Sequence, residues 1–410
     1  MAFFEFPNAR TFDSDLTWII DKIKELLAQC GSLTEAWEKF KEEFQNQLSD
    51  TVIQILQEWV DNGEFDEIIN DFILKTPYVY VDMMPGSNDT EKLETALQSG
   101  KTIYFTNRVY NINQNITVPT GCILHGLASR GTTINLTGNI TLSNFAGLEN
   151  ISIIFTENNV YSVNMGVASK INEVFIRNAY TGIDTGSVCF ITNTTIEQCK
   201  QSILFSNVND VYLSNIIVNS TIENAFGLTF IGAIAIELLN VNVLNCTVAI
   251  QAQAGINRYC AFTNCYFDSC SNSATGNLER SWFTACWFSN RGNNAFNIGG
   301  DNITIANSFI SGSSPNGLFV TGSYCNIVNN QFQSNSNNDI VIGENSDYNN
   351  ISGNIFTNNE SEEYPNSNTG VVVRGSTEGH IIVTNNIGTK KNTVNRTGSN
   401  VINTNNITTN

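Results

Sequence analysis

Charged side chains are scarce in this sequence, and basic ones are the scarcer of the two kinds. Its 410 residues include 38 Asp and Glu but only 20 Lys and Arg, which gives a net charge of −18. Charged residues reach 14% of the chain, where about a quarter is usual for a globular protein. Because nucleic acids are bound through clustered Lys and Arg, this balance excludes nucleic acid as an expected partner.

Long apolar runs and histidines are also missing. No window approaches the roughly 18 uncharged apolar residues of a membrane-spanning helix, so we expect no membrane span. His125 and His380 are the only histidines, and they lie far apart in the sequence. A Ser–His–Asp or Cys–His arrangement would need one of them as its base. We expect both to be structural or solvent-exposed instead.

The ten cysteines follow no metal-binding pattern. No pair has zinc-finger spacing with a matching second pair, so we expect no metal and no cofactor. The first residues carry neither the basic nor the apolar segment of a secretory signal. We therefore expect the chain to fold in a reducing cytosol and interpret its cysteines as buried thiols.

In place of charge the sequence has Asn, Thr, Ser and Gly, and its pattern divides it into three parts. The first part, residues 1–75, is predicted to be helical, because apolar residues recur at steps of three and four within 13–30, 33–59 and 64–74. The longest of these apolar stripes packs either on the other helices of the same chain or on another subunit. Its steps do not form a clean heptad, so the pattern favours neither alternative.

Residues 76–112 are predicted to be a junction and a capping segment. Asp89 or Thr90 is expected to cap a short helix that Gly100 ends, with Leu93 and Ala96 facing inward. A strand pattern follows the helix. Since the end of a stack of strands exposes unpaired backbone, this helix would cover it.

Residues 113–410 repeat themselves. Asn followed at the second position by an aromatic residue or Ile recurs roughly every 20–30 residues, at Asn215, Asn264, Asn307, Asn330, Asn354, Asn385 and Asn405. A repeat of this length predicts a solenoid, in which strands of successive coils lie about 4.8 Å apart and like residues stack on like. We expect a mainly β body, a parallel β-helix of about 14 coils and ~65 Å in length.

The segment 258–291 gathers most of the side chains suited to binding sugars. Strand alternation, counted with the Asn-x-aromatic positions pointing inward, places Phe267 and Trp287 on the outer face of adjacent coils. Two exposed aromatic residues in one column would form a platform for sugar rings. Arg280 and Arg291 complete the predicted carbohydrate-binding set. The residues taken as inward are Asn264, Tyr266, Cys286 and Phe288.

Asp268 and Glu279 are the carboxylates that we predict as catalytic if the protein cleaves a glycan, one as the acid and the other as base or nucleophile. The opposing interpretation is that Phe267 and Trp287 are buried between subunits and that the charges surround that interface. The sequence leaves both open, and it leaves open whether the protein is an enzyme.

Two resemblances extend these predictions. The block from Gly86 to Ile112, followed by Val118–Gly126, resembles the opening of the pectate-lyase-like superfamily of right-handed single-stranded parallel β-helices. That resemblance implies the fold but does not bring the catalytic motifs of the superfamily. The chain has no Asp-Asp pair, and Glu378-Gly379-His380 lacks the first glycine of a Gly-His-Gly motif.

A helical segment before a β-helix resembles the tail-spike and neck-appendage proteins of bacteriophages, and Phe6–Trp18 is similar to their virion-anchoring segments. This resemblance implies a virion protein made in the host cytoplasm, a homotrimer, attachment to other tail or neck proteins through the N-terminal helices, and host adsorption through a bacterial surface glycan. A free-standing bacterial polysaccharide lyase or glycoside hydrolase and a purely structural trimeric fibre are the alternatives.

Overall fold

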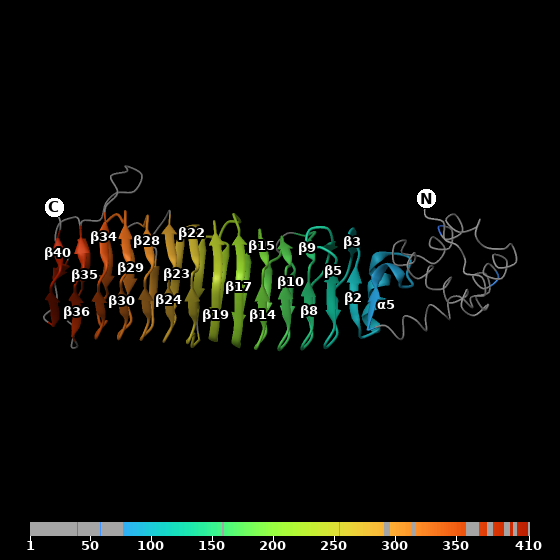
Figure 1. The fold of residues 1–410 in the computed structure, drawn as a ribbon, viewed down its shortest axis with the longest axis horizontal. Coiled ribbons are helices and arrows are strands. Elements are labelled where there is room, and N and C mark those ends of the chain that lie inside the picture. Colours follow the sequence, from blue (N-terminus) through green and yellow to red (C-terminus); the bar gives the residue numbers. More distant parts are fainter. Residues whose placement is uncertain are drawn as a thin grey trace, which may run out of the picture.

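The structure, a computed structural model, shows the chain from residue 77 to 408 as a rod of stacked coils (Figure 1). Within that range it describes every residue except 158–159, 254, 291–295, 314–315, 358–368, 375–379, 389–393 and 397–399. Before residue 77 it describes Lys39 and Glu58 alone. The helices predicted within residues 1–75, and the boundary after residue 75, therefore lie outside the described residues.

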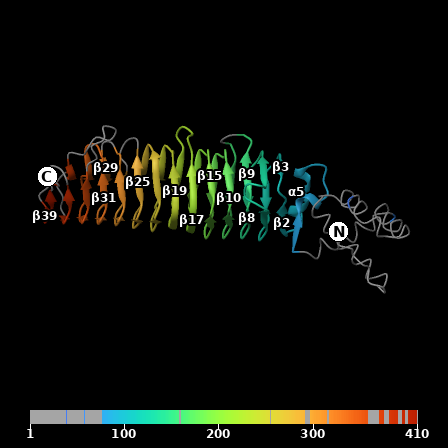
Figure 2. The same cartoon turned by 45° about the horizontal axis from the view of Figure 1, so that its top comes forward.

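The coils build two parallel sheets, of 27 and 13 strands among the described residues. A typical coil gives two short strands to the larger sheet, such as β24 (Trp282–Thr284) and β25 (Trp287–Asn290), and one to the smaller. Each strand pairs in parallel with its counterpart one coil away (Figure 2). The described strands form no antiparallel hairpin, so the predicted parallel solenoid is confirmed.

Thirteen coils contribute to the smaller sheet, against the roughly 14 predicted for the body, and β39 (Val401–Thr404) with β40 (Ile407–Thr408) begins another coil. The strands of the smaller sheet are β4 (Ile116–Val118), β7 (Ile140–Leu142), β10 (Ser162–Met165), β13 (Thr181–Thr185), β16 (Gln201–Ser206), β18 (Phe226–Ile231), β20 (Val248–Ala252), β23 (Asn272–Asn277), β26 (Phe296–Gly299), β29 (Asn316–Val320), β32 (Asn338–Ile342), β35 (Thr369–Val373) and β38 (Val394–Arg396).

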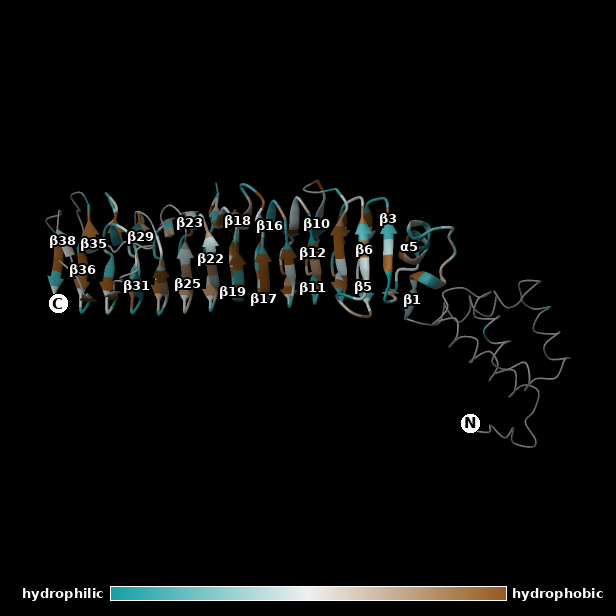
Figure 3. Ribbon diagram, turned by 90° about the horizontal axis from the view of Figure 1, so that it is seen from above, coloured by the Kyte–Doolittle hydropathy of each residue, from teal (hydrophilic) through white to brown (hydrophobic). Residues whose placement is uncertain are grey.

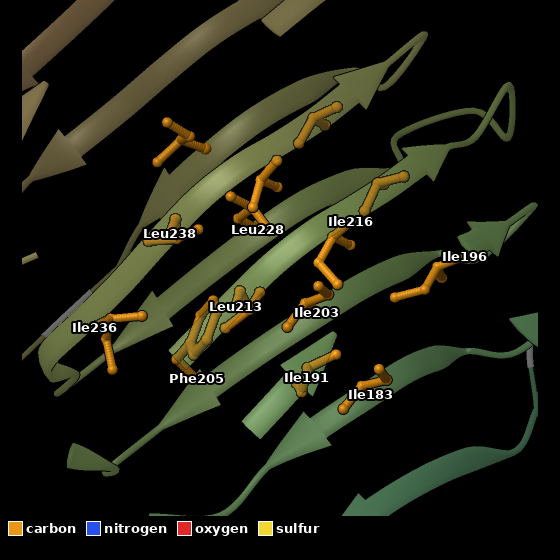
Figure 4. Packing of buried hydrophobic residues seen from close by; sticks show 14 of the residues in the cluster. Ile183, Ile191, Ile196, Ile203, Phe205, Leu213, Ile216, Leu228, Ile236 and Leu238 are labelled. Atoms are coloured by element: carbon orange, nitrogen blue, oxygen red, sulfur yellow. The ribbon is translucent and has the colours of Figure 1, made fainter. Parts of the chain in front are cut away.

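The interior of the rod is filled by columns of apolar side chains. Period-two alternation turns every second strand residue inward, where it stacks on its counterpart one coil away (Figure 4). Phe262 and Phe283 stack at 4.3 Å between ring centroids with planes 8° apart. Figure 3 shows hydrophobic residues on strands along the whole rod. Burial of this continuous core is what holds one coil on the next.

The first coil is covered by helix α5 (Asp89–Gln98), as the sequence predicted. Leu93 and Ala96 are its buried residues, and Gly100 follows its end at φ +66°. The predicted cap was wrong by one residue. Asn88 is the N-cap, and its side-chain oxygen accepts a hydrogen bond from the Glu91 amide at 3.0 Å.

Asp89 has a different partner from the one expected of a cap residue. Its carboxylate accepts hydrogen bonds from the Arg108 guanidinium at 2.8 Å and from the Asn111 amide at 2.9 Å. Arg108 also pairs with Asp82, whose other oxygen accepts a hydrogen bond from the Tyr110 hydroxyl at 2.6 Å. These contacts tie the helix to β3 (Val109–Ile112) and to the residues before it.

Asparagine has two structural roles in the coils, and the sequence pattern did not distinguish between them. Between the two strands that a coil gives to the larger sheet lies a residue with φ near +55°, which Asn adopts more readily than most residues. Asn307 and Asn329 hold that position. Asn330 and Asn354 belong to the next column, where they are buried. The predicted alignment of Asn307 with Asn330 was therefore wrong by one residue.

Nine of the ten cysteines are free and buried, which confirms the prediction of buried thiols for the part of the chain that the structure describes. Cys30 lies outside that part. The described residues include no helix long and apolar enough to cross a membrane.

Candidate functional site

Three aromatic side chains stack on the outside of the rod near its middle. Tyr266, Trp287 and Phe309 come from β22 (Tyr266–Cys270), β25 and β28 (Phe309–Ser311), which lie side by side in the larger sheet. The centroids of Tyr266 and Trp287 are 5.6 Å apart, and those of Trp287 and Phe309 are 4.2 Å apart. Trp287 remains 38% exposed. Stacking of successive coils thus places an aromatic column on the surface.

The column lies in an open groove of about 880 Å³ that follows the rod axis. Asn242 precedes Tyr266 in the same column, and Gln331 and Ile355 follow Phe309. The other lining residues are Leu244, Asn264, Cys265, Ala285, Cys286, Asn307, Ser308, Asn329 and Asn330. Every lining side chain is aromatic, aliphatic, an amide, a hydroxyl or a thiol, so the groove offers ring faces and neutral hydrogen-bonding groups.

An asparagine ladder leads to one side of the groove. Asn264 donates to Asn240 at 2.7 Å, and Asn240 donates to Asn215 at 3.0 Å. The ladder stops at Ala285, which takes the turn position in the next coil. Beyond Ala285, the side-chain amides of Asn307 and Asn329 are exposed and have no hydrogen-bond partner among the described residues. The side chains of Asn215, Asn240 and Asn264 bond to one another, whereas those of Asn307 and Asn329 are open to a ligand.

Tyr266 has a carboxylate neighbour at the edge of the groove. Burial raises the pKa of the Tyr266 hydroxyl, and the charge of Asp268 and a hydrogen bond to it raise the pKa further. Asp268 lies two residues along β22 and faces outward, level with Ser289 of the next coil. Asp268 is thus an acidic residue beside the aromatic column.

Phe267 does not lie on the outer face, where strand alternation predicted it. It is fully buried and stacks on Phe288 at 5.2 Å inside the rod. The left-handed conformation of Asn264 shifts the alternation, so Cys265 and Phe267 point inward and Tyr266 points outward. The outward prediction was wrong for Phe267, and Tyr266 takes its place beside Trp287. A signal was present in Asn264, since Asn at a turn favours φ above zero.

Asp268 and Glu279 are not brought together. Glu279 lies in the same coil as Ser289, and Arg258 lies in the preceding coil, that of Asp268. Glu279 forms a backbone β-bridge with Arg258, and Ser289 pairs with Asp268. Strand β24 and the turn residue Ala285 lie between Glu279 and Ser289. Extended residues span about 3.3 Å each, so the two carboxylates are ~20–30 Å apart. Glycosidase pairs require about 5–10 Å, and this pairing was therefore wrong.

The structure describes one of the two predicted arginines, Arg280. Arg280 is exposed at a turn on the other edge of the larger sheet, where it donates to the Tyr259 hydroxyl at 2.7 Å. That contact raises the pKa of Arg280 above its ordinary value. Arg280 is not part of the groove lining. Arg291 lies outside the described residues.

Neither histidine lines the groove. The His125 ring packs against Tyr104 with centroids 4.8 Å apart and planes tilted by 51°, and its Nδ1 lies 3.2 Å from Glu149. His380 is exposed in a later coil. Both positions agree with the expectation of structural or solvent-exposed histidines.

No family model matches the sequence. One curated relative, the pre-neck appendage protein of Bacillus phage B103, is 30% identical over 129 residues. The match covers 28% of this chain and 15% of the relative, so the chain matches only a small part of that relative's length.

Solved structures with the same fold include phage proteins and an enzyme. Tailspike protein 3 of bacteriophage CBA120 is 12% identical with a TM-score of 0.56, over 82% of this chain and 62% of that one. The Dettilon tailspike protein is 14% identical with a TM-score of 0.53, over 81% and 68%. An α-1,3-glucanase catalytic unit from Streptomyces thermodiastaticus reaches 0.52 at 11% identity, over 79% and 69%. The chain is thus a β-solenoid that resembles phage appendage and tailspike proteins.

Proposed function

We propose that this chain is a virion appendage or tail spike whose β-helix binds a polysaccharide of the bacterial surface. The observation that carries the proposal is the exposed column of Tyr266, Trp287 and Phe309 within a groove of neutral amides. Sugar rings have an apolar face that packs on aromatic rings and hydroxyls that bond to amides, and the groove offers both. The phage relative and the two tailspike structures support the virion role.

The polysaccharide is bound along the rod axis rather than across it. The groove runs from Asn242 to Ile355, which are five coils apart in one column. At about 4.8 Å a coil, that is ~24 Å of continuous surface. A chain of several sugars would lie along it, whereas a single small molecule would fill only a part.

The proposal is tested with surface polysaccharides prepared from a panel of bacterial strains. We expect Tyr266→Ala and Phe309→Ala each to weaken binding about tenfold, or ~1.4 kcal/mol. Trp282→Ala is the matched control, because Trp282 lies in the same coil as Trp287, is 44% exposed and does not line the groove. Binding that both groove variants retain in full, or no binding by the intact protein, would contradict the proposal.

Cleavage is examined in the same samples. New reducing ends or unsaturated products would assign an enzyme activity to the chain, of the kind that a free polysaccharide lyase or glycoside hydrolase has. The described groove lining contains no carboxylate. We therefore expect binding without products, and products that persist in the Tyr266 and Phe309 variants would place the activity elsewhere on the rod.

Residues 1–75 are proposed to attach the protein to other tail or neck proteins of the virion and to hold three chains together. The full chain should then have three times the 45.2 kDa mass of one chain by light scattering after size-exclusion chromatography. A monomer would contradict the trimer. A trimer that buries Trp287, seen as protection of that residue from oxidative labelling, would favour the subunit interface over the glycan site.

A further inference from the structure

Exposed isoleucines gather on the larger sheet near the C-terminal end of the rod (Figure 1). Their strands are β34 (Ile355–Thr357), β36 (Ile381–Thr384), β37 (Ile387–Gly388), β39 and β40. Stacking of the coils arranges them in two columns, one of Ile382 and Ile402 and the other of Ile355, Ile387 and Ile407. We call these five residues the isoleucine face.

The isoleucine face is 39–55% exposed at each of its residues. Ile402 stacks on Ile382 and Ile407 stacks on Ile387, yet Ile382 and Ile387 keep 39% and 43% of their surface in solvent. The end of the rod therefore does not account for their exposure. Single exposed isoleucines are ordinary on a protein surface, whereas neighbouring ones that form a patch mark an interaction site.

A turn separates the two columns. Asn385, at φ +57°, turns the chain between β36 and β37, and Asn405, at φ +55°, does the same between β39 and β40. Each of these two coils therefore carries one isoleucine on either side of its turn, at the same height along the rod. Both columns repeat at about 4.8 Å, so one side of the turn matches the other side of a parallel copy coil by coil.

The charge of the chain also favours a contact between copies at this face. Each copy carries a net charge of −18, so copies repel one another except where a surface is uncharged. The segments 350–357, 381–388 and 401–408 contain no charged residue, whereas 170–177 in the same sheet contains Lys170, Glu173 and Arg177.

The charged residues that the structure describes in these last coils lie away from the isoleucine face. They are in the smaller sheet or between that sheet and the next strand: Asp339, Glu344, Asp347, Arg374, His380 and Arg396. The guanidinium of Arg374 is 6.0 Å from the ring centroid of Phe319, a residue of the smaller sheet.

We propose that the isoleucine face packs against a second copy of this chain, with one side of the turn against the other side in the neighbouring copy. Contacts of this head-to-tail kind close into a ring of parallel rods. The inference rests on the trimer of the proposed function and adds to it the part of the β-helix where the copies touch. Trp287 lies three coils before Ile355, outside the isoleucine face.

The first test measures whether the face is covered in the full chain. Ile387→Cys is compared with Ile217→Cys, both with Cys30→Ser, because the other nine cysteines are buried. Ile217 is the matched control, since it is also 43% exposed and lies in the same column, but between Thr195 and Asn242. We expect a polar maleimide to label position 387 at least tenfold more slowly than position 217. Equal rates would overturn the proposal.

The second test identifies what covers the face. The Ile387→Cys chain is co-expressed with a tagged copy, either intact or carrying Ile402→Asp, and mixed assemblies are purified through the tag. The tagged copy with Ile402→Asp should raise labelling of the other chain at least threefold, because only contact between copies transmits the change. Unchanged labelling would assign the cover to the same chain, and a tagged intact copy that retains no second chain would exclude a stable assembly. Either result overturns the proposal.

Failure here is distinguishable from failure of the proposed function. A monomer that binds surface polysaccharide, with binding weakened by Tyr266→Ala, would remove the contact between copies and leave the glycan site in place.

Discussion

At the scale of single residues, asparagine is exposed at one position of the coil and buried at the next. At the turn it adopts a left-handed backbone and faces solvent, as Asn329 does. One residue later it is buried, and the column of Asn330, Asn354, Asn386 and Asn406 links four coils through side-chain hydrogen bonds. The buried side-chain amides also donate to backbone carbonyls of the preceding coil. Each amide thereby provides a hydrogen bond that the turn does not supply.

Asn354→Ala should be strongly destabilising. The Asn354 side chain accepts from the Asn330 amide at 2.9 Å and donates to Asn386 at 3.0 Å and to the Ile327 carbonyl at 2.9 Å. Its removal leaves the buried Asn330 N–H and the Ile327 carbonyl without this partner, at a cost of about 2–4 kcal/mol.

Asn350→Ala is the control, because Asn350 lies in the same coil and its bond to Asn326 is long, at 3.4 Å, and exposed. It should change the thermal midpoint only slightly. Equal midpoints for the two variants would show that the buried ladder does not stabilise the coils.

At the scale of the elements, helix α5 is joined to the first coils by charge as well as by apolar contact. Burial opposes ionisation of Asp82, but hydrogen bonds from Thr106, Tyr110 and Arg108 outweigh it and hold its pKa below the ordinary 3.8. Asp89 is likewise lowered, with burial opposed by its bonds to Arg108 and Asn111. Burial and the bond to Asp82 raise the pKa of Tyr110 to about 12.

These shifts predict a pH dependence of stability. Because the folded pKa of Asp82 lies below the unfolded one, its contribution is complete above about pH 4 and is lost as pH falls through the folded pKa. Asp82→Asn should lower the thermal midpoint at pH 7 and flatten its fall below pH 4. Since the pKa of Tyr110 is raised, its contribution is complete below about pH 10 and is lost as pH rises through about 12.

The control for acid stability is Glu237→Gln, an exposed carboxylate in the middle of the rod. Its acid profile should match that of the intact chain. An unchanged profile in Asp82→Asn would mean that the network does not control acid stability.

At the scale of the whole molecule, each described coil pairs with the coils before and after it. Such a solenoid gains stability from each coil and each interface, so damage stays local. Buried phenylalanine rings pack on one another between Phe262 and Phe296, at the same height along the rod as the groove. The stack that fills the inside and the column that faces outside therefore depend on the same register.

Phe283→Ala should loosen the middle of the rod without unfolding its ends. Phe283 is fully buried and contacts Phe262, Phe288 and Phe296, and its truncation costs about 3–5 kcal/mol. Hydrogen exchange should rise in the adjacent coils and stay unchanged from β2 (Thr102–Phe105) to β13.

Trp282→Ala, at the exposed neighbouring position, should leave exchange as it is. A uniform rise in exchange along the rod after Phe283→Ala would instead show that all coils unfold as one unit.

The sequence by itself determined the solenoid, its capping helix, the buried cysteines and the scarcity of charge, because coil length, alternation and composition are local properties. It also identified Trp287 as an outward aromatic residue. Only the tertiary structure decided which residues share a column. One left-handed residue at Asn264 reverses the direction of Tyr266 and Phe267, and stacking of separate coils brings Tyr266, Trp287, Phe309 and Gln331 into one groove. Register between coils depends on turn conformation in every coil, which the spacing of asparagines alone does not specify.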